Sequence, residues 1–108
     1  MRRGEIWTVA GGVYASKPRT ALIIQDDRFH VTSSVTVCPL STALRDAPLT
    51  RVPVEPTEAN GLGQPSEIMV DRITTVRRAN VGGRVGELTK QDMIRVEQSL
   101  LVFLGIAG

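Results

Sequence analysis

The sequence predicts a small α+β domain in which several short strands form a barrel and one C-terminal helix covers a face of the sheet. Short apolar runs, rich in β-branched residues and bounded by polar residues or glycine, are typical of strands and occur along most of the chain. Helical spacing of apolar residues is confined to the C-terminal end. No repeat or linker interrupts the 108 residues, so we expect a single domain covering residues 1–108.

The stretch from Arg19 to Asp27, RTALIIQDD, is expected to contain the central strand. Residues 21–24 form a continuous apolar run, which is typical of a strand buried on both faces. Pro18 disfavours helix at the residue before it and marks the entry to the strand. A side chain at the end of such a rigid strand can be held in one direction, so Arg19 is the first candidate for a functional residue.

Alternation and turn residues predict the other strands. The first is expected at residues 5–9, followed by a loop at 11–16. Later strands are expected at residues 35–40, 51–55, 66–70, 73–76 and 84–88, with loops at 41–48 and 80–83. Pro39 and Pro53 fall inside two of these strands, and proline is tolerated there mainly at a strand end or on an edge strand.

The C-terminal segment has helical periodicity. Thr89 and Asp92 form a capping-box pattern, which indicates a helix start. Gly105 is well placed to end the helix. The apolar stripe that we expect to face the sheet consists of Met93, Val96, Leu100, Leu101, Phe103 and Leu104.

Composition restricts the cellular setting. The hydrophobic content of 42% is that of a folded chain. The single cysteine, Cys38, excludes an internal disulfide and favours a reducing compartment, and its neighbours indicate a core residue rather than a nucleophile. The sequence has no apolar stretch long enough for a membrane span and no signal-like N-terminus. We therefore expect a cytoplasmic protein that does not bind membranes.

Positive charge is unevenly distributed, although the formal net charge is only +2. Arginines crowd two parts of the chain, namely Arg2, Arg3, Arg19 and Arg28, and then Arg72, Arg77, Arg78 and Arg84. Arginine suits bidentate phosphate contacts, which favours a polyanionic partner. The same charges also fit a solvated basic surface, and charge alone does not decide between the two interpretations.

Several catalytic motifs are absent from the sequence. It contains neither a GxxxxGK[ST] phosphate loop nor a GxGxxG dinucleotide loop. One cysteine and one histidine, His30, cannot form a structural zinc site. We expect no metal and no cofactor.

The remaining candidates are Arg19 and the hydroxyls of Ser41 and Thr42, which end the strand expected at 35–40. If the two strands pair, a guanidinium and a hydroxyl can meet in one cleft and hold a phosphodiester. RNA supplies its own nucleophile, the 2′-OH, so its cleavage needs neither a metal nor a covalent enzyme intermediate. On sequence chemistry alone, however, a turn-capping role for Ser41 and Thr42 is the simpler interpretation.

Four stretches taken in order match a known pattern: MRRGEIW, RTALIIQDD, VTVCPLST and SEIMVDRITTV. The later GRVGELT and the terminal LLVFLGI extend the match to nearly the whole chain. On these motifs the sequence resembles the MazF/PemK family of toxin endoribonucleases from type II toxin–antitoxin systems.

The resemblance implies an SH3-like barrel with a C-terminal helix, working as a homodimer. It also implies metal-independent, sequence-specific cleavage of single-stranded RNA that leaves a 2′,3′-cyclic phosphate, and neutralisation by an acidic antitoxin. It places the catalytic arginine on Arg19 and the catalytic hydroxyl on Ser41. The other substrate-binding residues that we expect are Lys17, Thr20, Arg28, Thr42 and Arg72.

The sequence departs from the family pattern at three places. Thr20 stands where the family has proline after the arginine, and an alternative register would give the catalytic role to Lys17. Ser41 replaces a threonine but keeps the hydroxyl. The loop at 11–16 is short and lacks the family's acidic residue, which affects the expected RNA specificity.

Two alternative functions remain open on the sequence. One is a CcdB-like, non-enzymatic toxin that binds DNA gyrase and has no need of Arg19 and Ser41 together. The other is a structural or RNA-binding barrel, in which the pair is a coincidence.

Overall fold

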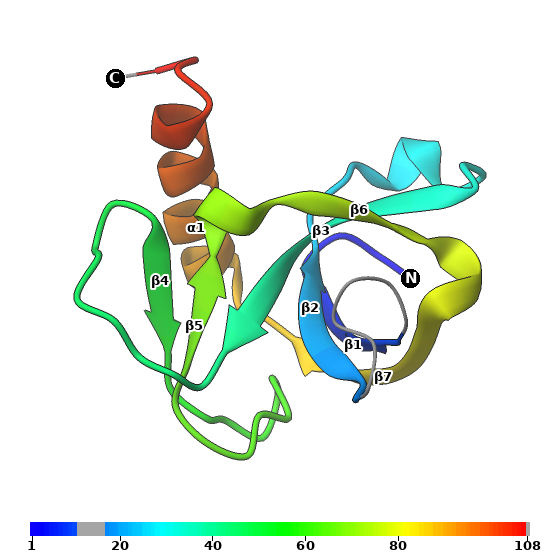
Figure 1. Cartoon of the computed structure of the whole chain (residues 1–108), viewed down its shortest axis with the longest axis horizontal. Helices are drawn as coiled ribbons and strands as arrows, with labels where there is room; N and C mark the ends of the chain where they lie inside the picture. The colour runs from blue at the N-terminus through cyan, green and yellow to red at the C-terminus, as the bar shows by residue number, and fades with distance from the viewer. Residues whose placement is uncertain (11–16, 108) are drawn as a thin grey trace.

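The computed structural model of the chain describes residues 1–10 and 17–107, so the loop expected at 11–16 lies outside the described residues. The described chain forms a seven-stranded sheet and a C-terminal helix (Figure 1). The strands are β1 (Glu5–Val9), β2 (Arg19–Ile23), β3 (Ser34–Ser41), β4 (Arg51–Val54), β5 (Ser66–Met69), β6 (Thr74–Arg77) and β7 (Val81–Glu87). The helix is α1 (Lys90–Phe103), and short 3₁₀ turns are η2 (Asp27–Phe29), η3 (Val70–Arg72) and η4 (Arg78–Asn80).

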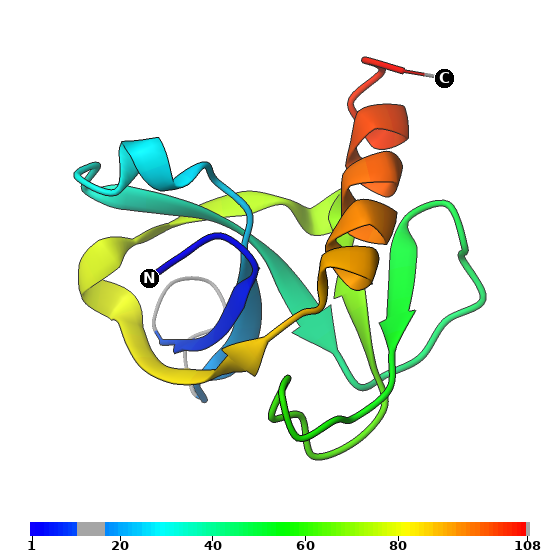
Figure 2. The same ribbon diagram turned by 180° about the vertical axis from the view of Figure 1, so that it is seen from behind.

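The sheet is antiparallel and strongly curled. Its strands follow the order β4-β5-β3-β2-β1-β7, and β6 also pairs with β3. Because β3 pairs with β6 along its first half and with β5 at its end, the sheet divides there into two halves. Helix α1 lies beside the half that contains β4 and β5, as the front and back views agree (Figure 2).

The prediction of an α+β fold with a C-terminal helix is confirmed, but the expected barrel is not closed. Strands β6 and β7 lie at opposite ends of the curled half of the sheet, where β6 pairs with β3 and β7 pairs with β1. The η4 turn links them covalently, and no hydrogen-bonded ladder joins them among the described residues. The sheet is therefore a curled, open one.

The expectation of a buried central strand is confirmed. Strand β2 lies between β1 and β3, and its residues Ala21, Leu22 and Ile23 are buried. Strands β1 and β3 pair with its backbone on the two sides. Its side chains enter an apolar cluster on each face of the sheet. The strand loses this cover only at Arg19, which is exposed.

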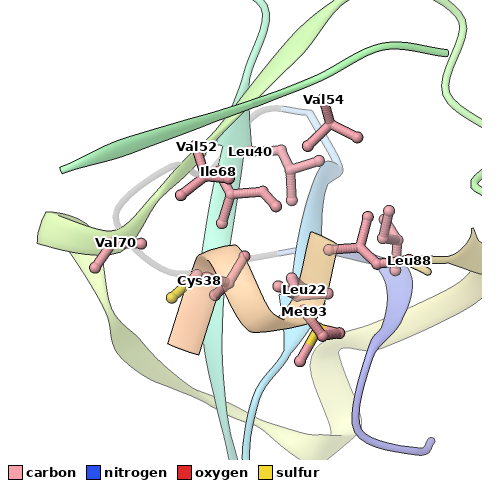
Figure 3. Close-up of a cluster of buried hydrophobic side chains, with 11 residues drawn as sticks. Leu22, Cys38, Leu40, Val52, Val54, Ile68, Val70, Leu88 and Met93 are labelled. Carbon is pink, nitrogen blue, oxygen red and sulfur yellow. The ribbon is translucent and has the colours of Figure 1, made fainter. Parts of the chain in front are cut away.

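The two faces of the sheet bury different residues, as the period of two along a strand requires. Leu22 and Cys38 belong to the larger cluster, between the sheet and α1 (Figure 3). Ala21, Ile23 and Val37 belong to a smaller cluster on the other face. The prediction that Cys38 is a core residue is thus confirmed.

Helix α1 begins as expected. The Thr89 side chain accepts a hydrogen bond from the Asp92 N–H (3.1 Å), and Met93 and Val96 are buried against the sheet. Gly105 adopts φ +73 just beyond the helix end, a conformation that glycine tolerates. The apolar stripe is shorter than expected, because Phe103 remains 43% exposed. The last turn extends past the sheet, so the exposed apolar residues there are Leu101, Val102, Phe103, Leu104 and Ile106.

The edge assignment holds for Pro53 and is wrong for Pro39. Pro53 lies in β4, at the end of the sheet, but Pro39 lies in the central strand β3. The Ile24 N–H bonds to the Thr36 carbonyl, and since bonding direction alternates along a strand, the Pro39 nitrogen faces away from β2. On that side β6 stops pairing at Val37 and β5 starts at Leu40. Pro39, which has no N–H to donate, therefore lies between the end of the β6 pairing and the start of the β5 pairing.

Strand β7 begins at Val81, three residues before the expected start. Gly82 and Gly83, which predicted a loop, run beside β1 instead. The Gly83 N–H donates to the Thr8 hydroxyl (2.9 Å), and a Cβ on Gly82 would lie 2.7 Å from the same oxygen. The glycines thus permit close approach of a strand rather than a turn.

Candidate active site

A cavity of about 610 Å³ opens on the face of the sheet opposite α1. Apolar side chains from several strands form much of its wall, including Val37 and Pro39 from β3, Met69 from β5 and Val76 from β6. The polar lining residues are Arg19, Thr20, Ser41, Arg45, Arg51, Arg72, Thr74, Thr75, Arg77 and Asn80. An apolar wall with a polar rim suits a ligand that has both a flat apolar part and a charged part.

Strand register brings the two predicted catalytic residues together in this cavity. Ala21 of β2 pairs with Pro39 of β3. Extending the antiparallel register by two residues places Arg19 opposite Ser41, and residues two apart share a face of the sheet. Both side chains line the cavity. Directly opposite side chains on adjacent strands lie close enough to bind one small group.

The Ser41 hydroxyl has one partner among the described residues. Its oxygen accepts the Ala43 N–H at 3.0 Å, which fixes the turn after β3. This is the turn-capping role expected of a serine at a strand end. Because the hydroxyl acts as acceptor in that bond, its hydrogen can still be donated to a phosphate oxygen. Capping and substrate binding are therefore compatible at Ser41.

Arginines dominate the charge of the cavity. Five line it, namely Arg19, Arg45, Arg51, Arg72 and Arg77, and no aspartate or glutamate is among its described lining residues. Cationic side chains gathered in a partly apolar hollow produce a strong local positive potential. The cavity therefore suits a polyanion much better than the net charge of +2 indicates.

One of these arginines differs from the others in being buried. Arg51, the first residue of β4, is 5% exposed and lies beside Asp71. Arg51 Nε is 3.3 Å from Asp71 Oδ1, and Arg51 Nη2 donates a long hydrogen bond of 3.4 Å to Asp71 Oδ2. Asp71 itself does not line the cavity. The pair therefore presents its cationic side to the cavity.

Four of the predicted site residues, Arg19, Thr20, Ser41 and Arg72, line the cavity, and three do not. Both Lys17 and Thr42 are exposed; Thr42 directly follows Ser41 in the chain, and Lys17 is two residues before Arg19. Arg28 is held in η2 by Asp26 at 3.1 Å and lies over the Phe29 ring. The structure thus brings together the two catalytic candidates and separates Arg28 from them.

Sequence reasoning did not select Arg45, Arg51 or the threonines of β6 as site residues. Arg77 was noted only as one member of a basic stretch, and the fold divides that stretch. Arg77 lines the cavity, whereas Arg78 donates to the Thr32 carbonyl (2.8 Å) and Arg84 pairs with Glu5 (2.9 Å). All four residues of β6 line the cavity, so alternation along that strand gave no signal that would have singled out its site residues.

Other titratable groups offer little alternative chemistry in the described part of the chain. Burial, helped by the negative charge of Asp71, raises the pKa of the Cys38 thiol to about 12, so it is protonated at neutral pH. Within residues 1–10 and 17–107, no cluster of three His, Cys, Asp or Glu residues could hold a metal ion. No helix in the same residues is long and apolar enough to cross a membrane.

The curled sheet, the C-terminal helix and the arginine-lined cavity define a small α+β protein whose cavity suits a polyanion. Residues 2–104 match the family described as the PemK-like, MazF-like toxin of type II toxin–antitoxin systems. The chain therefore belongs to this toxin family, as its motifs predicted. It is 56% identical over 109 residues to a protein named probable endoribonuclease MazF from Mycolicibacterium smegmatis, and the match covers 100% of both chains.

Solved structures show the same fold. An endoribonuclease from mycobacterial species, described as in complex with its cognate antitoxin, superimposes with a TM-score of 0.83 at 25% identity, covering 100% of this chain and 98% of that chain. The Mycobacterium tuberculosis toxin MazF-mt6 gives a TM-score of 0.80 at 25% identity, covering 94% and 96%. MazF from Deinococcus radiodurans, at 18% identity and a TM-score of 0.78 with 97% and 96% covered, shares the fold.

Proposed function

We propose that this toxin is an endoribonuclease and that the arginine-lined cavity is its RNA-cleaving site. The observation that carries the proposal is the strand register that sets Arg19 opposite Ser41 in that cavity. A relative of the same length is named a probable endoribonuclease, which supports the same activity here. The substrate is single-stranded RNA, because its flexible backbone can place one phosphodiester between the two side chains.

The proposed reaction is an in-line attack by the 2′-OH on the adjacent phosphorus. The new O2′–P bond forms as the P–O5′ bond breaks, the 2′ proton is lost and the 5′ oxygen gains one. The products are a 2′,3′-cyclic phosphate and a 5′-hydroxyl, with no metal required. Negative charge accumulates on the non-bridging oxygens, where Arg19 can donate two hydrogen bonds and Ser41 one.

Arg19 is assigned to charge stabilisation and not to proton abstraction, because a guanidinium is a donor of hydrogen bonds with no acceptor site for a proton. Thr20 and Arg72 line the same cavity and are proposed to bind substrate there. Lys17 and Thr42 are exposed and lie within two residues of Arg19 and Ser41 in the chain, so they are proposed to contact the flanking RNA backbone. Arg28 has no such position, so any contact it makes with RNA lies outside the cavity.

The proposed partners follow from the same charge pattern. A similar structure contains an endoribonuclease with its cognate antitoxin, which supports an antitoxin for this chain. An acidic antitoxin segment complements five cavity arginines in the way that RNA does.

Exposed apolar residues at the end of α1 support assembly into a homodimer. We place the toxin in the cytoplasm, where its RNA substrate is found.

The alternative, a CcdB-like toxin that binds DNA gyrase without catalysis, has less support. The family that matches residues 2–104 is PemK-like and MazF-like. A gyrase-binding surface also requires no arginine opposite a hydroxyl inside a cavity.

Incubation of the purified protein with mixed RNA in EDTA tests the proposal directly. We expect cleavage at a short recurring sequence, with 2′,3′-cyclic phosphate ends detected by mass spectrometry. Intact RNA under these conditions, or cleavage that requires added metal, would contradict it.

A further inference from the structure

The proposed chemistry leaves Arg51 without a task, although it is the most buried charged residue that lines the cavity. Taking a guanidinium out of water is costly unless its donors are matched. Here the match is poor, because Arg51 Nε and Asp71 Oδ1 make no hydrogen bond with any described residue despite their 3.3 Å separation. The Nε edge of the guanidinium faces Asp71, and the opposite edge of this buried cation faces the cavity, where it can donate to a ligand.

The position of Arg51 is set by the sheet. Arg51 pairs with Met69 of β5, and extending the β3–β5 register by one residue places Met69 beside Pro39, which pairs with Ala21 of β2. Cross-strand neighbours point to the same face, and all four residues line the cavity. Arg51 therefore shares the cavity with the Arg19–Ser41 pair but stands two strands away from β3.

The charge around Arg51 argues against a second phosphate site. Asp71 lies within 3.3 Å and neutralises much of the guanidinium charge. A phosphate bound on the cavity side of Arg51 would also meet the negative charge of Asp71 behind the guanidinium, and that repulsion would weaken its binding. A neutral hydrogen-bond acceptor meets no such penalty, so the Arg51–Asp71 pair favours a base edge over a phosphate.

We propose that Arg51 reads one nucleobase next to the scissile phosphate, an inference that rests on the proposed endoribonuclease function. An arginine fork donates two parallel hydrogen bonds and needs two adjacent acceptors. Guanine offers O6 and N7, and cytosine offers O2 and N3, whereas adenine and uracil alternate donors with acceptors along these edges. The base is therefore guanine or cytosine, with its face against the apolar wall at Met69 and Val76.

Asp71 is a positioning residue in this arrangement. It does not line the cavity, and its carboxylate holds the guanidinium from behind through one hydrogen bond to Nη2 and a charge contact at Nε. Loss of Asp71 should therefore weaken base selectivity without removing a group that touches RNA.

The test is cleavage of an oligonucleotide panel in which each position around the mapped cut carries A, C, G or U in turn. We expect wild type to prefer guanine or cytosine over adenine and uracil by about ten-fold or more at one position, which identifies the base. Arg51→Met should still cleave but with the preference at that position lost. Arg51→Lys keeps the positive charge but not the forked guanidinium, so it should lose most of the base preference at that position.

Folding is controlled separately, because Arg51→Met leaves the Asp71 carboxylate without its partner. The double variant Arg51→Met/Asp71→Asn removes both charges. It is assayed on the oligonucleotide panel if its thermal unfolding matches that of the wild type. Full retention of the base preference in any folded variant that lacks Arg51 overturns the inference, as does a wild type with no guanine or cytosine preference at any position.

A binding measurement separates this inference from the proposed activity. 2′-O-methyl oligonucleotides cannot be cleaved, so fluorescence anisotropy reports recognition alone. If wild type cleaves no RNA but binds such oligonucleotides with a guanine or cytosine preference that Arg51→Met abolishes, the proposed function fails and Arg51 recognition stands. Binding without any base preference overturns the recognition whether or not RNA is cleaved.

Discussion

Arg19 and Ser41 stand opposite each other on adjacent antiparallel strands, at the point where β2 begins and β3 ends. The paired positions Ala21 and Pro39 set this register, and both candidate side chains line the same cavity. Antiparallel pairing brings the start of β2 beside the end of β3, and the register between the two strands then decides which residues stand opposite each other. The proposed catalytic pair thus depends on strand topology and register as well as on side-chain chemistry.

Removal of the guanidinium tests the pair most directly. Arg19→Ala should raise the cleavage barrier by at least ~3 kcal/mol, which is the cost of losing an oxyanion-type donor. The measurement is single-turnover cleavage of a defined RNA by variants with matched thermal unfolding. Arg95→Ala on α1 is the control, since Arg95 pairs with Asp92 outside the cavity and its loss should leave the rate near wild type. Full activity of folded Arg19→Ala would remove the cleavage site from this end of the sheet and make Lys17 the next candidate.

Ser41→Ala should cost less than Arg19→Ala, because it removes one hydrogen bond to the phosphate and exposed Thr42 is adjacent. Ser41→Thr, which keeps the hydroxyl, should retain most activity. The combined Arg19→Ala/Ser41→Ala variant should lose less than the sum of the single losses if both residues act on one phosphate. Strictly additive losses in the double-mutant cycle would show that the two side chains act independently.

The strands were largely predictable because their apolar runs report burial directly. The run at Ala21 to Ile24 predicted a central strand, and β2 is one. Pro39 and the Gly82–Gly83 pair were misassigned because their meaning depends on partners that are distant in sequence. Proline fits β3 only where two neighbouring strands leave a gap, and glycine fits β7 because Thr8 lies close by. Barrel closure likewise depends on curvature, which strand patterns do not encode.

Arg19 and Ser41, which were selected because they stand at strand ends, both line the cavity. Arg51 was missed because one arginine in an RVPV strand gives no sign of a buried partner, and Asp71 is distant in sequence. Arg28 was selected on charge, and only the folded chain shows that Asp26 holds it in η2. Local charge density therefore indicated a cationic surface without identifying which arginines line the cavity.

Acid should destabilise the protein partly through Glu5. Burial alone would raise the pKa of this carboxyl, but hydrogen bonds from the Arg2 N–H, Trp7 Nε1 and Arg84 Nε outweigh it and lower the pKa from 4.5 to about 2. Because the folded pKa is the lower one, the stabilisation is present above pH 4.5 and is lost as the pH falls toward 2. A shift of this size corresponds to up to ~3 kcal/mol of unfolding free energy.

Glu5→Gln should therefore be less stable than wild type at pH 7 and nearly equal to it near pH 2, as measured by urea unfolding across pH. Glu87→Gln is the matched control, since Glu87 is mostly exposed and 3.8 Å from Arg84, and a surface pair contributes little. An equal pH dependence in wild type and Glu5→Gln would show that Glu5 does not carry this effect.

Self-association should involve the apolar end of α1. Five exposed apolar residues are concentrated there, and contiguous apolar surface of this kind marks interaction sites. We expect a two-fold dimer in sedimentation velocity at micromolar concentration, and Phe103→Asp should shift it toward monomer. Ile94→Asp, a similar change nearer the helix start, is the comparison. A wild type that sediments only as a monomer would exclude the dimer.

RNA and the antitoxin should exclude each other from the cavity. Five arginines line it with no described carboxylate among them, so an acidic peptide and an RNA backbone compete for the same charges. We expect an acidic antitoxin segment to block cleavage and to be displaced by 2′-O-methyl RNA in a competition assay.

The association rate of the acidic segment should fall as salt rises, because screening weakens long-range steering. A neutral variant of the peptide should show little salt dependence. Arg72→Ala, which removes one cavity arginine, should slow association, and Arg95→Ala should not. Simultaneous binding of the peptide and RNA, with cleavage unimpaired, would place the antitoxin on a different surface.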